Sequence, residues 1–150
     1  MSKNYAIELL KYKILKKEFN KKLFKRNNEE DAGIDIPIPL KSDFIIVKPG
    51  VTRIPLGISV EIPEGYMGIL YPRSGYTTRG LISLQPPIDR VYSGEIHLIL
   101  LNLNDDIVIH KDERLCQLVL VRIPDKIIDE EVNEIKSGNR GNKGFNSSGR

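Results

Sequence analysis

Short apolar runs, each closed by glycine, proline, asparagine or aspartate, follow one another along most of the chain. They are too short for helices of ordinary length and are rich in β-branched residues, which is typical of strands. In GIDIPIPL, residues 33–40, two prolines also exclude a helix. The runs predict strands at 5–15, 33–40, 44–47, 57–62, 67–71, 81–84, 95–103, 106–110 and 114–123. Many short strands at close spacing predict an all-β fold: a sandwich, a jelly roll or a barrel.

The C-terminal end has a different composition. The only helix candidate is a short one at 129–135, which the pattern fits equally well as a strand. Residues 137–150, SGNRGNKGFNSSGR, contain one apolar side chain, that of Phe145, and so cannot bury a core of their own. Because 150 residues is the size of a single domain, we expect one β-domain over 1–136 and a flexible, glycine-rich arm over 137–150.

Charge and cysteine content restrict the function classes. No apolar run approaches the roughly 20 residues that cross a bilayer, so we expect no membrane partner and an intracellular place, cytoplasmic or nuclear. Cys116 is the only cysteine, which excludes an intrachain disulfide and makes a Cys/His zinc site implausible. Any metal would be a hard ion with oxygen ligands. Residues 1–30 carry nine Lys/Arg against four Asp/Glu, an excess that we interpret as a solvated surface and not as a nucleic-acid site.

Two segments resemble loops that carry chemistry. Residues 71–75, YPRSG, bring a guanidinium, a hydroxyl and turn N–H groups together, which suits a phosphate, although a solvated turn has the same composition. Residues 86–95, PPIDRVYSGE, offer Asp89 as a general base and Tyr92 as a platform for a ring. In the alternative interpretation, Asp89 accepts hydrogen bonds within a turn and Tyr92 covers the edge of the core.

Two further features are ambiguous on their own. Gln117 interrupts the apolar run 115–121 and, if buried, needs a partner from the backbone, a neighbouring subunit or a ligand. The segment 137–150 lacks the GxxxxGK[ST] pattern of a P-loop. It would form an anion-binding, ring-stacking flap if a ligand ordered it, and would otherwise be an end without a role. The side chains that would form the flap are Arg140, Lys143, Phe145, Ser147 and Ser148.

Taken in order, five segments resemble the five motifs of the trimeric dUTPases (dUTP diphosphatases). They are DAGIDI at 31–36, PRSG at 72–75, Ile88-Asp89 with Tyr92 and Gly94, RLCQL at 114–118, and Arg140-Gly141 with Gly144-Phe145 and Ser147-Ser148-Gly149. The resemblance covers nearly the whole chain. It implies a jelly-roll homotrimer that hydrolyses dUTP to dUMP and pyrophosphate with Mg²⁺, each site drawing residues from more than one subunit.

The resemblance also implies roles for the matching residues. Asp89 would activate the water that attacks the α-phosphorus, and Tyr92 would lie under the deoxyribose, leaving no room for a 2′-hydroxyl. Asp35 would lie near the water shell of a Mg²⁺ held mainly by the triphosphate. Arg140 would meet the γ-phosphate and Phe145 would stack on uracil when the arm closes. The other implied substrate-binding residues are Arg73, Ser74, Gly75, Ser83, Ile88, Gln117, Gly144, Ser147 and Ser148.

One departure from the family pattern concerns the base. Where the family usually has a glycine and an aliphatic residue before Ile-Asp, this chain has Pro86 and Pro87, which cannot donate a backbone N–H. We therefore expect the donors for uracil to come from nearby positions such as Ser83, Leu84 or Gln85.

Two rival functions share the fold. A dCTP deaminase would need a catalytic glutamate at the position that Ile99 occupies, and an aliphatic side chain cannot move protons. A nucleotide-binding or regulatory module without turnover is disfavoured because Asp89, Tyr92, Arg140 and Phe145 are all retained, although Pro86 and Pro87 leave it open. Pyrophosphate release from a panel of deoxynucleoside triphosphates separates these alternatives from a dUTPase.

Overall fold

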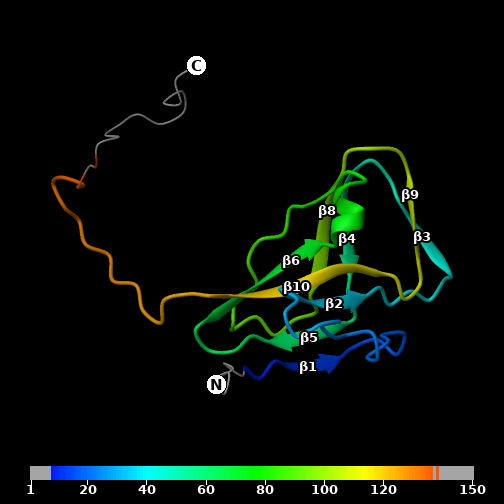
Figure 1. Ribbon diagram of the computed structural model, residues 1–150, viewed down its shortest axis with the longest axis horizontal. Coiled ribbons are helices and arrows are strands. Elements are labelled where there is room, and N and C mark those ends of the chain that lie inside the picture. The colour runs from blue at the N-terminus through cyan, green and yellow to red at the C-terminus, as the bar shows by residue number, and fades with distance from the viewer. Residues whose placement is uncertain (1–7, 137, 139–150) are drawn as a thin grey trace.

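The computed structural model describes residues 8–136 and residue 138, and this part of the chain is nearly all β (Figure 1). A single one-turn helix interrupts the series of strands there. The elements, in chain order, are β1 (Lys11–Ile14), β2 (Gly33–Pro37), β3 (Phe44–Val47), β4 (Gly50–Pro55), β5 (Ile58–Glu61), β6 (Tyr66–Pro72), α1 (Ser74–Thr77), β7 (Leu81–Ser83), β8 (His97–Asn102), β9 (Ile107–His110) and β10 (Arg114–Arg122). Within the described ranges, no helix is long and apolar enough to span a membrane.

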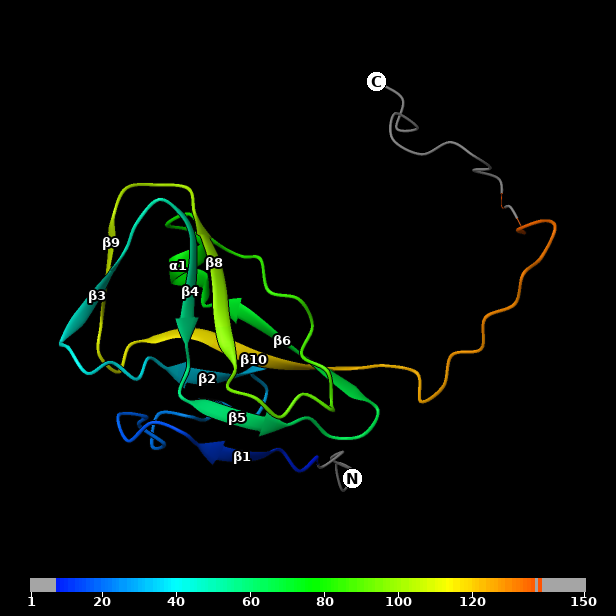
Figure 2. The same cartoon turned by 180° about the vertical axis from the view of Figure 1, so that it is seen from behind.

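The strands pair antiparallel in small sheets of two or three strands. Two sheets have three strands, in the orders β2-β10-β6 and β4-β8-β7, and two sheets are the pairs β1-β5 and β3-β9. Figures 1 and 2 show β4 and β8 running across the direction of β2 and β10, with β5 and β1 along one side. None of these orders follows the chain, so each sheet joins segments that are distant in sequence.

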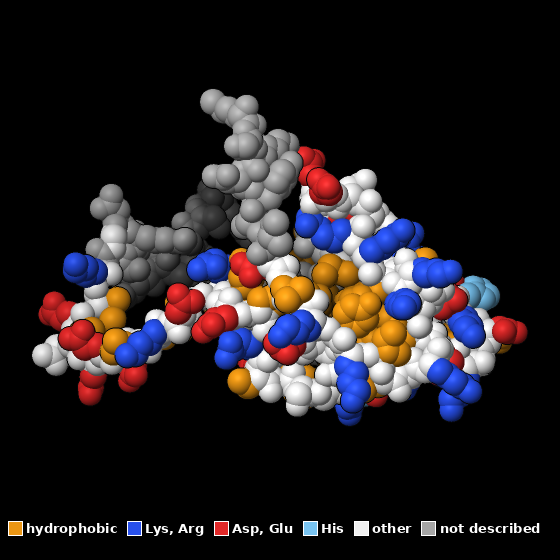
Figure 3. All heavy atoms as spheres, turned by 90° about the horizontal axis from the view of Figure 1, so that it is seen from below, with side chains coloured by type: hydrophobic (Ala, Val, Ile, Leu, Met, Phe, Trp, Pro, Cys, Tyr) orange, Lys and Arg blue, Asp and Glu red, His pale blue; other side chains and the backbone are white. Residues whose placement is uncertain are grey.

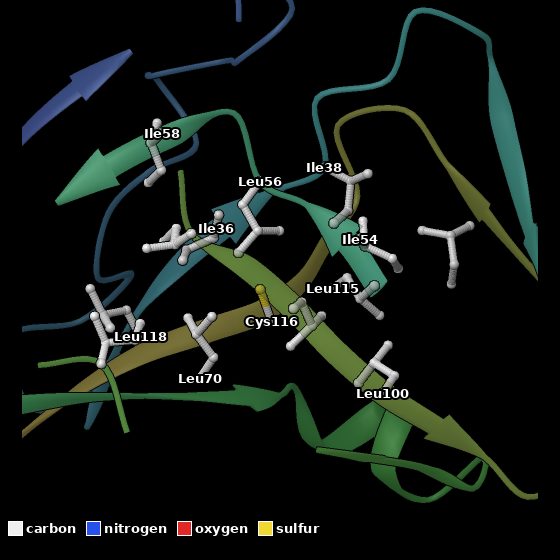
Figure 4. Close-up of a cluster of buried hydrophobic side chains, with 14 of the residues drawn as sticks. Ile36, Ile38, Ile54, Leu56, Ile58, Leu70, Leu100, Leu115, Cys116 and Leu118 are labelled. Atoms are coloured by element: carbon white, nitrogen blue, oxygen red, sulfur yellow. The ribbon is translucent and has the colours of Figure 1, made fainter. Parts of the chain in front are cut away.

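The core lies where these sheets face one another (Figure 4). Strands such as β5, β8 and β9 contribute alternate residues, as the two-residue period of a strand requires. In β8, for example, Leu98 and Leu100 are fully buried while Ile99 between them is partly exposed. They pack with Ile36 of β2, Leu70 of β6 and Cys116 of β10 in one cluster. Burial raises the pKa of the Cys116 thiol far above its usual range, and the negative charge of Asp35 adds to the shift, so this thiol is unreactive in the folded chain.

The all-β prediction is confirmed, and the predicted strands within the described ranges are present, with shifted ends except at 44–47, which is β3. The run 5–15 supplies only β1, and 95–103 supplies β8. Two elements were not predicted. β4 contains Thr52 and Arg53 and ends at Pro55, which hides its strand pattern, and α1 forms where the sequence suggested a turn. The prediction of a short helix or strand at 129–135 was wrong, since that segment is neither.

The chain beyond β10 leaves the body of the molecule. Residues 123–136 run outward as an extended segment in both ribbon views (Figures 1 and 2). Ile127, Ile128 and Ile135 are 79%, 77% and 82% exposed, although large aliphatic side chains are normally buried. We call residues 123–136 the C-terminal segment.

Candidate functional site

Most of the residues singled out in the described part of the sequence fall into two groups, which lie at opposite ends of β6. The first group surrounds Asp35, one of two buried polar residues in the described part of the chain. The second lies on the connection between β7 and β8 and contains Asp89 and Tyr92. Ile88, which precedes Asp89, forms a two-bond bridge with Gly68 near the start of β6, whereas Arg73 directly follows the end of β6. Arg73 lies five residue steps along the chain from Gly68, roughly 16 Å at the rise of a strand.

The strand register brings Asp35 and Gln117 together. Gln117 of β10 is directly opposite both Asp35 of β2 and Tyr71 of β6, so these three side chains share the face of the sheet that points away from the core. Gly33, at the start of β2, makes room for the glutamine, because a Cβ there would lie 2.6 Å from Gln117 Oε1. Gln117 therefore lies beside Asp35 and Tyr71 on its own sheet.

Two guanidinium groups and an amide hold the Asp35 carboxylate. Oδ1 lies 3.4 Å from Nε of Arg73, and Oδ2 lies 3.3 Å from Nη1 of Arg114. The side-chain amide of Asn27 donates to Oδ2 at 2.9 Å, and its carbonyl oxygen accepts from Arg114 Nη1 at 2.6 Å. We call Asn27, Asp35, Arg73 and Arg114 the Asp35 cluster. Two positive charges against one negative leave it with a surplus positive charge, which suits an anion.

The backbone and α1 fix the position of Arg73. Its N–H donates to the carbonyl of Leu115 at 2.9 Å, which ties it to β10. Tyr76, two residues beyond Ser74 in α1, donates its hydroxyl to Glu113 in the turn between β9 and β10. A Cβ added at Gly75 would meet nothing within 4 Å, so the space beside this residue is open. Ser74 and Gly75 thus lie beside Arg73 on an anchored turn of helix.

The second group borders a cavity of about 300 Å³. That volume is at the lower end of the range of about 300–1,000 Å³ that is usual for small-molecule sites. Mostly apolar walls carry a few polar groups, as in such sites generally. The lining residues are Arg53, Gln85, Pro86, Pro87, Ile88, Asp89, Tyr92, Ile96, His97 and Ile99.

Hydrogen bonds within the connection hold Tyr92 in place at this cavity. Its N–H donates to the carbonyl of Asp89 at 3.0 Å, which closes a turn, and its hydroxyl donates to the carbonyl of Glu95 at 2.8 Å. The ring lies so close to Gly94 that a Cβ there would be 2.6 Å from the Tyr92 hydroxyl oxygen. Asp89 is exposed, and no other described residue bonds to its carboxylate, which leaves that group open to water.

Glu95 anchors the same connection to the body of the molecule. Its carboxylate accepts from the N–H of Gly57 at 2.9 Å and lies 3.2 Å from Nζ of Lys16. Burial alone would raise the pKa of Glu95, but the hydrogen bonds from Lys16 and Gly57 and the charge of Lys16 outweigh it and hold the pKa below its usual range. The Glu95 side chain is therefore charged at neutral pH and positions the segment that carries Tyr92.

The structure adds functional candidates that sequence reasoning missed. Arg114 stood within a recognised motif but had no assigned role, and nothing in the sequence distinguished Asn27 or the side chain of Glu95. Ser83, one of the predicted binding residues, is used internally: its hydroxyl donates to the carbonyl of Leu70 at 2.8 Å. The remaining predictions lie outside the described residues: Arg140, Gly144, Phe145, Ser147 and Ser148.

The sequence of this chain is similar to those of known proteins. The family model for dUTPase matches residues 20–149. Two curated relatives carry the name deoxyuridine 5′-triphosphate nucleotidohydrolase. That of Corynebacterium glutamicum is 34% identical over 150 residues, with 95% of this chain and 97% of the relative covered. That of Bdellovibrio bacteriovorus is 40% identical over 124 residues, with 79% and 82% covered.

Solved structures give the same result. The dUTPase of Staphylococcus bacteriophage 80alpha with dUPNHPP has a TM-score of 0.82 and 28% identity, with 96% of this chain and 100% of that chain covered. A mutant dUTPase of phage phi11 of S. aureus, described as revealing the coordination of a structural Mg(II) ion, has a TM-score of 0.72 and 25% identity, with 85% and 98% covered.

Proposed function

The chain belongs to the dUTPase family, and we propose that it hydrolyses dUTP to dUMP and pyrophosphate with a water molecule that Asp89 activates. The observation that carries this proposal is the cavity beside the connection from β7 to β8, which has both Asp89 and Tyr92 in its lining. A carboxylate suits the role of general base because it can accept the proton of the attacking water. The exposed position of Asp89 supports this role, since water reaches its carboxylate directly.

Tyr92 would distinguish deoxyribose from ribose. Two hydrogen bonds made by Tyr92 and the close approach of Gly94 restrict its ring, so the ring cannot move aside for a larger sugar. A 2′-hydroxyl pressed against the ring would clash, and burying it without a partner would cost roughly 1–3 kcal/mol. Tyr92 would therefore select deoxyribose by steric exclusion of the 2′-hydroxyl and not by a hydrogen bond.

The Asp35 cluster would hold the phosphates. Its surplus positive charge attracts the triphosphate, and Arg73 presents guanidinium N–H groups for phosphate oxygens, with Ser74 and Gly75 beside it. In this arrangement Asp35 is a positioning residue, because its carboxylate fixes the direction of Arg73. Gln117, on the same face, would orient the phosphates or the attacking water.

The oxygen donors fit a Mg²⁺ that the triphosphate mainly holds. Among residues 8–136 and 138, no group of three or more His, Cys, Asp or Glu could hold a metal ion. An ionised carboxylate has about four lone-pair sites, and at Asp35 three of them face Arg73, Arg114 and Asn27. At most one site is left, and the two guanidinium charges beside it repel a cation, so we expect Asp35 to reach Mg²⁺ only through water. When bound, Mg²⁺ would neutralise charge that develops on the phosphate oxygens.

A homotrimer with shared sites agrees with two features of the protomer. The Asp35 cluster and the Asp89 connection lie at opposite ends of β6, which favours a site that joins them across a subunit boundary. The C-terminal segment also needs a partner. Burying one of its exposed isoleucines would stabilise an assembly by about 1.5–3 kcal/mol.

Charge complementarity supports a second copy of this chain as that partner. The C-terminal segment carries Asp125, Asp129, Glu130, Glu131 and Glu134 among its apolar residues. Figure 3 shows lysine and arginine side chains around exposed apolar ones on the face that contains β1, and several acidic side chains along the C-terminal segment, which also carries Lys126 and Lys136. We expect residues 137–150 to close over the neighbouring site, with Arg140 on the γ-phosphate and Phe145 on uracil.

One experiment tests the function against its rivals. Purified protein is incubated with Mg²⁺ and each of dUTP, dCTP, dTTP and UTP, and pyrophosphate and base products are measured. We expect pyrophosphate from dUTP at a rate far above the others. Release of ammonia from dCTP would indicate a deaminase, and binding of dUTP without turnover would indicate a regulatory module. Ile99 in the cavity wall argues against the deaminase.

A further inference from the structure

A dUTPase must distinguish uracil from cytosine, so the inference that follows rests on the proposed function. The structure limits which groups beside the cavity can donate a hydrogen bond to the base. From Leu84 to Ile88, every backbone N–H is either missing or engaged. Pro86 and Pro87 have none. The N–H of Leu84 donates to the carbonyl oxygen of Ile99 at 3.0 Å, and the N–H of Gln85 donates to Oγ of Ser83 at 3.2 Å. The N–H of Ile88 donates to the carbonyl oxygen of Gly68 at 2.7 Å. On this side of the cavity a base must therefore find its donor on a side chain.

The side chain of Gln85 is the donor that this segment offers. Gln85 is half-buried and lines the cavity together with Asp89 and Tyr92. Its terminal amide cannot rotate freely, because the N–H of Ile99 on β8 donates to Oε1 at 3.0 Å. Only an oxygen can accept from that N–H, so the orientation of the amide is fixed and Nε2 takes the opposite position. No other described residue accepts a hydrogen bond from Nε2.

We propose that Gln85 is a specificity-determining residue, whose Nε2 donates to the C4 carbonyl oxygen of uracil. Cytosine carries an amino group at C4, which is itself a donor, so two donors would face each other and both would lose a partner. A site that hydrogen-bonds one substrate group discriminates strongly against an analogue that lacks it. Gln85 thereby supplies from its side chain the hydrogen-bond donor that Pro86 and Pro87 cannot supply from the backbone.

The other polar groups of the cavity are placed differently. The Nδ1 atom of His97 is 2.9 Å from the carbonyl oxygen of Glu95, so this nitrogen is already engaged. The hydroxyl of Tyr92 donates to the same carbonyl oxygen. Arg53, on β4, also lines the cavity, and its guanidinium has no fixed orientation from a described hydrogen bond. Of these groups, the Gln85 amide alone is both anchored and left with a free donor.

The substitution Gln85→Glu distinguishes a role of Gln85 in recognising the base from a purely structural role. The carboxylate keeps an oxygen for the N–H of Ile99 but has no N–H to donate, and it can accept from the amino group of cytosine. The measurement is kcat/KM for dUTP and for dCTP with Mg²⁺, with pyrophosphate release as the readout. Because both substrates carry the same triphosphate, the added charge affects them equally and cancels in the ratio.

We expect the dUTP to dCTP ratio of kcat/KM to fall about tenfold or more in Gln85→Glu, while Tm stays close to that of the unsubstituted protein. The neutral variant Gln85→Met, which removes both hydrogen bonds, should lower the ratio as well and replaces the first variant if that one does not fold. An unchanged ratio in a folded variant would overturn the proposal. Failure of the unsubstituted protein to hydrolyse dUTP would instead contradict the proposed function, so the two failures are distinguishable.

Discussion

Oδ1 of Asp35 lies 3.4 Å from Nε of Arg73, so a nearly buried carboxylate on β2 fixes the guanidinium that follows β6. The same carboxylate meets Arg114, and Asn27 bridges the two, so four residues from four separate parts of the chain act as one unit. In the proposed enzyme this unit sets the direction from which Arg73 approaches a phosphate. Its outermost member, Asn27, makes no contact with the substrate in this account and is the residue through which the unit can be tested.

Replacing Asn27 by alanine should weaken substrate binding more than chemistry. The variant loses one hydrogen bond to Asp35 and one to Arg114, both with charged partners, which should lower the free energy of unfolding by about 1–3 kcal/mol. We expect KM for dUTP to rise several-fold with kcat nearly unchanged. Denaturant unfolding and steady-state kinetics measure the two effects. A fall in kcat at constant KM would show that the cluster acts on the chemical step.

Replacing Tyr92 by alanine should reduce discrimination against ribose. Space opens beneath the sugar, so we expect the dUTP to UTP ratio of kcat/KM to fall about tenfold. Tyr12→Ala is a matched control, because Tyr12 is 42% exposed against 45% for Tyr92 and does not line the cavity. If the Tyr92 variant keeps the ratio of the unsubstituted protein, the sugar is read elsewhere.

Glu95 should make stability depend on pH. Its pKa is lower in the folded chain than the usual 4.5, so its carboxylate stabilises the fold above that pH, and the contribution disappears as the pH falls through the folded pKa. Thermal unfolding of Glu95→Gln and of the unsubstituted protein should therefore differ most at neutral pH and converge below 4.5. A difference in Tm that is constant from pH 7 to pH 3 would contradict the assigned ion pair with Lys16.

Shared sites predict that two inactive proteins can restore activity together. A protein without residues 138–150 should keep its assembly and Tm but lose most of its turnover, because the residues expected to stack on uracil and meet the γ-phosphate are gone. Mixed with Asp89→Asn protomers under conditions that exchange subunits, it should regain part of the activity. Sedimentation establishes whether mixed trimers form, and no recovery in verified mixed trimers would mean that the segment serves its own subunit's site.

Sequence reasoning succeeded where a pattern repeats and failed where a contact joins distant parts of the chain. The alternating and β-branched runs predicted most strands because the two-residue period is visible locally. β4 escaped because polar residues and Pro55 obscure that period, although pairing with β8 stabilises it. Residues 129–135, within the C-terminal segment, include apolar side chains but have no surface of their own protomer to pack against, so neither a helix nor a strand forms.

The candidate site shows the same contrast between local motifs and contacts that join distant parts of the chain. Asp89, Tyr92 and Arg73 stand in motifs that can be read along the chain, but no motif marks Asn27, which reaches Asp35 only because the loop before β2 folds over that strand. The sequence shows that Pro86 and Pro87 lack N–H groups, and so raises the question of the base donor. Only the fold shows that the N–H groups of Leu84 and Gln85 are already engaged, which moves the answer to a side chain.

The central claim, that Asp89 activates the water in dUTP hydrolysis, is tested most directly by Asp89→Asn. The amide keeps the shape of the side chain but loses the basic oxygen, so kcat for dUTP should fall by about 10²-fold or more. The Kd for a non-hydrolysable dUTP analogue, measured by calorimetry, should stay within about tenfold, since the cavity and the Asp35 cluster are unchanged. Near-normal turnover by a folded Asp89→Asn protein would remove Asp89 from the mechanism and contradict the account.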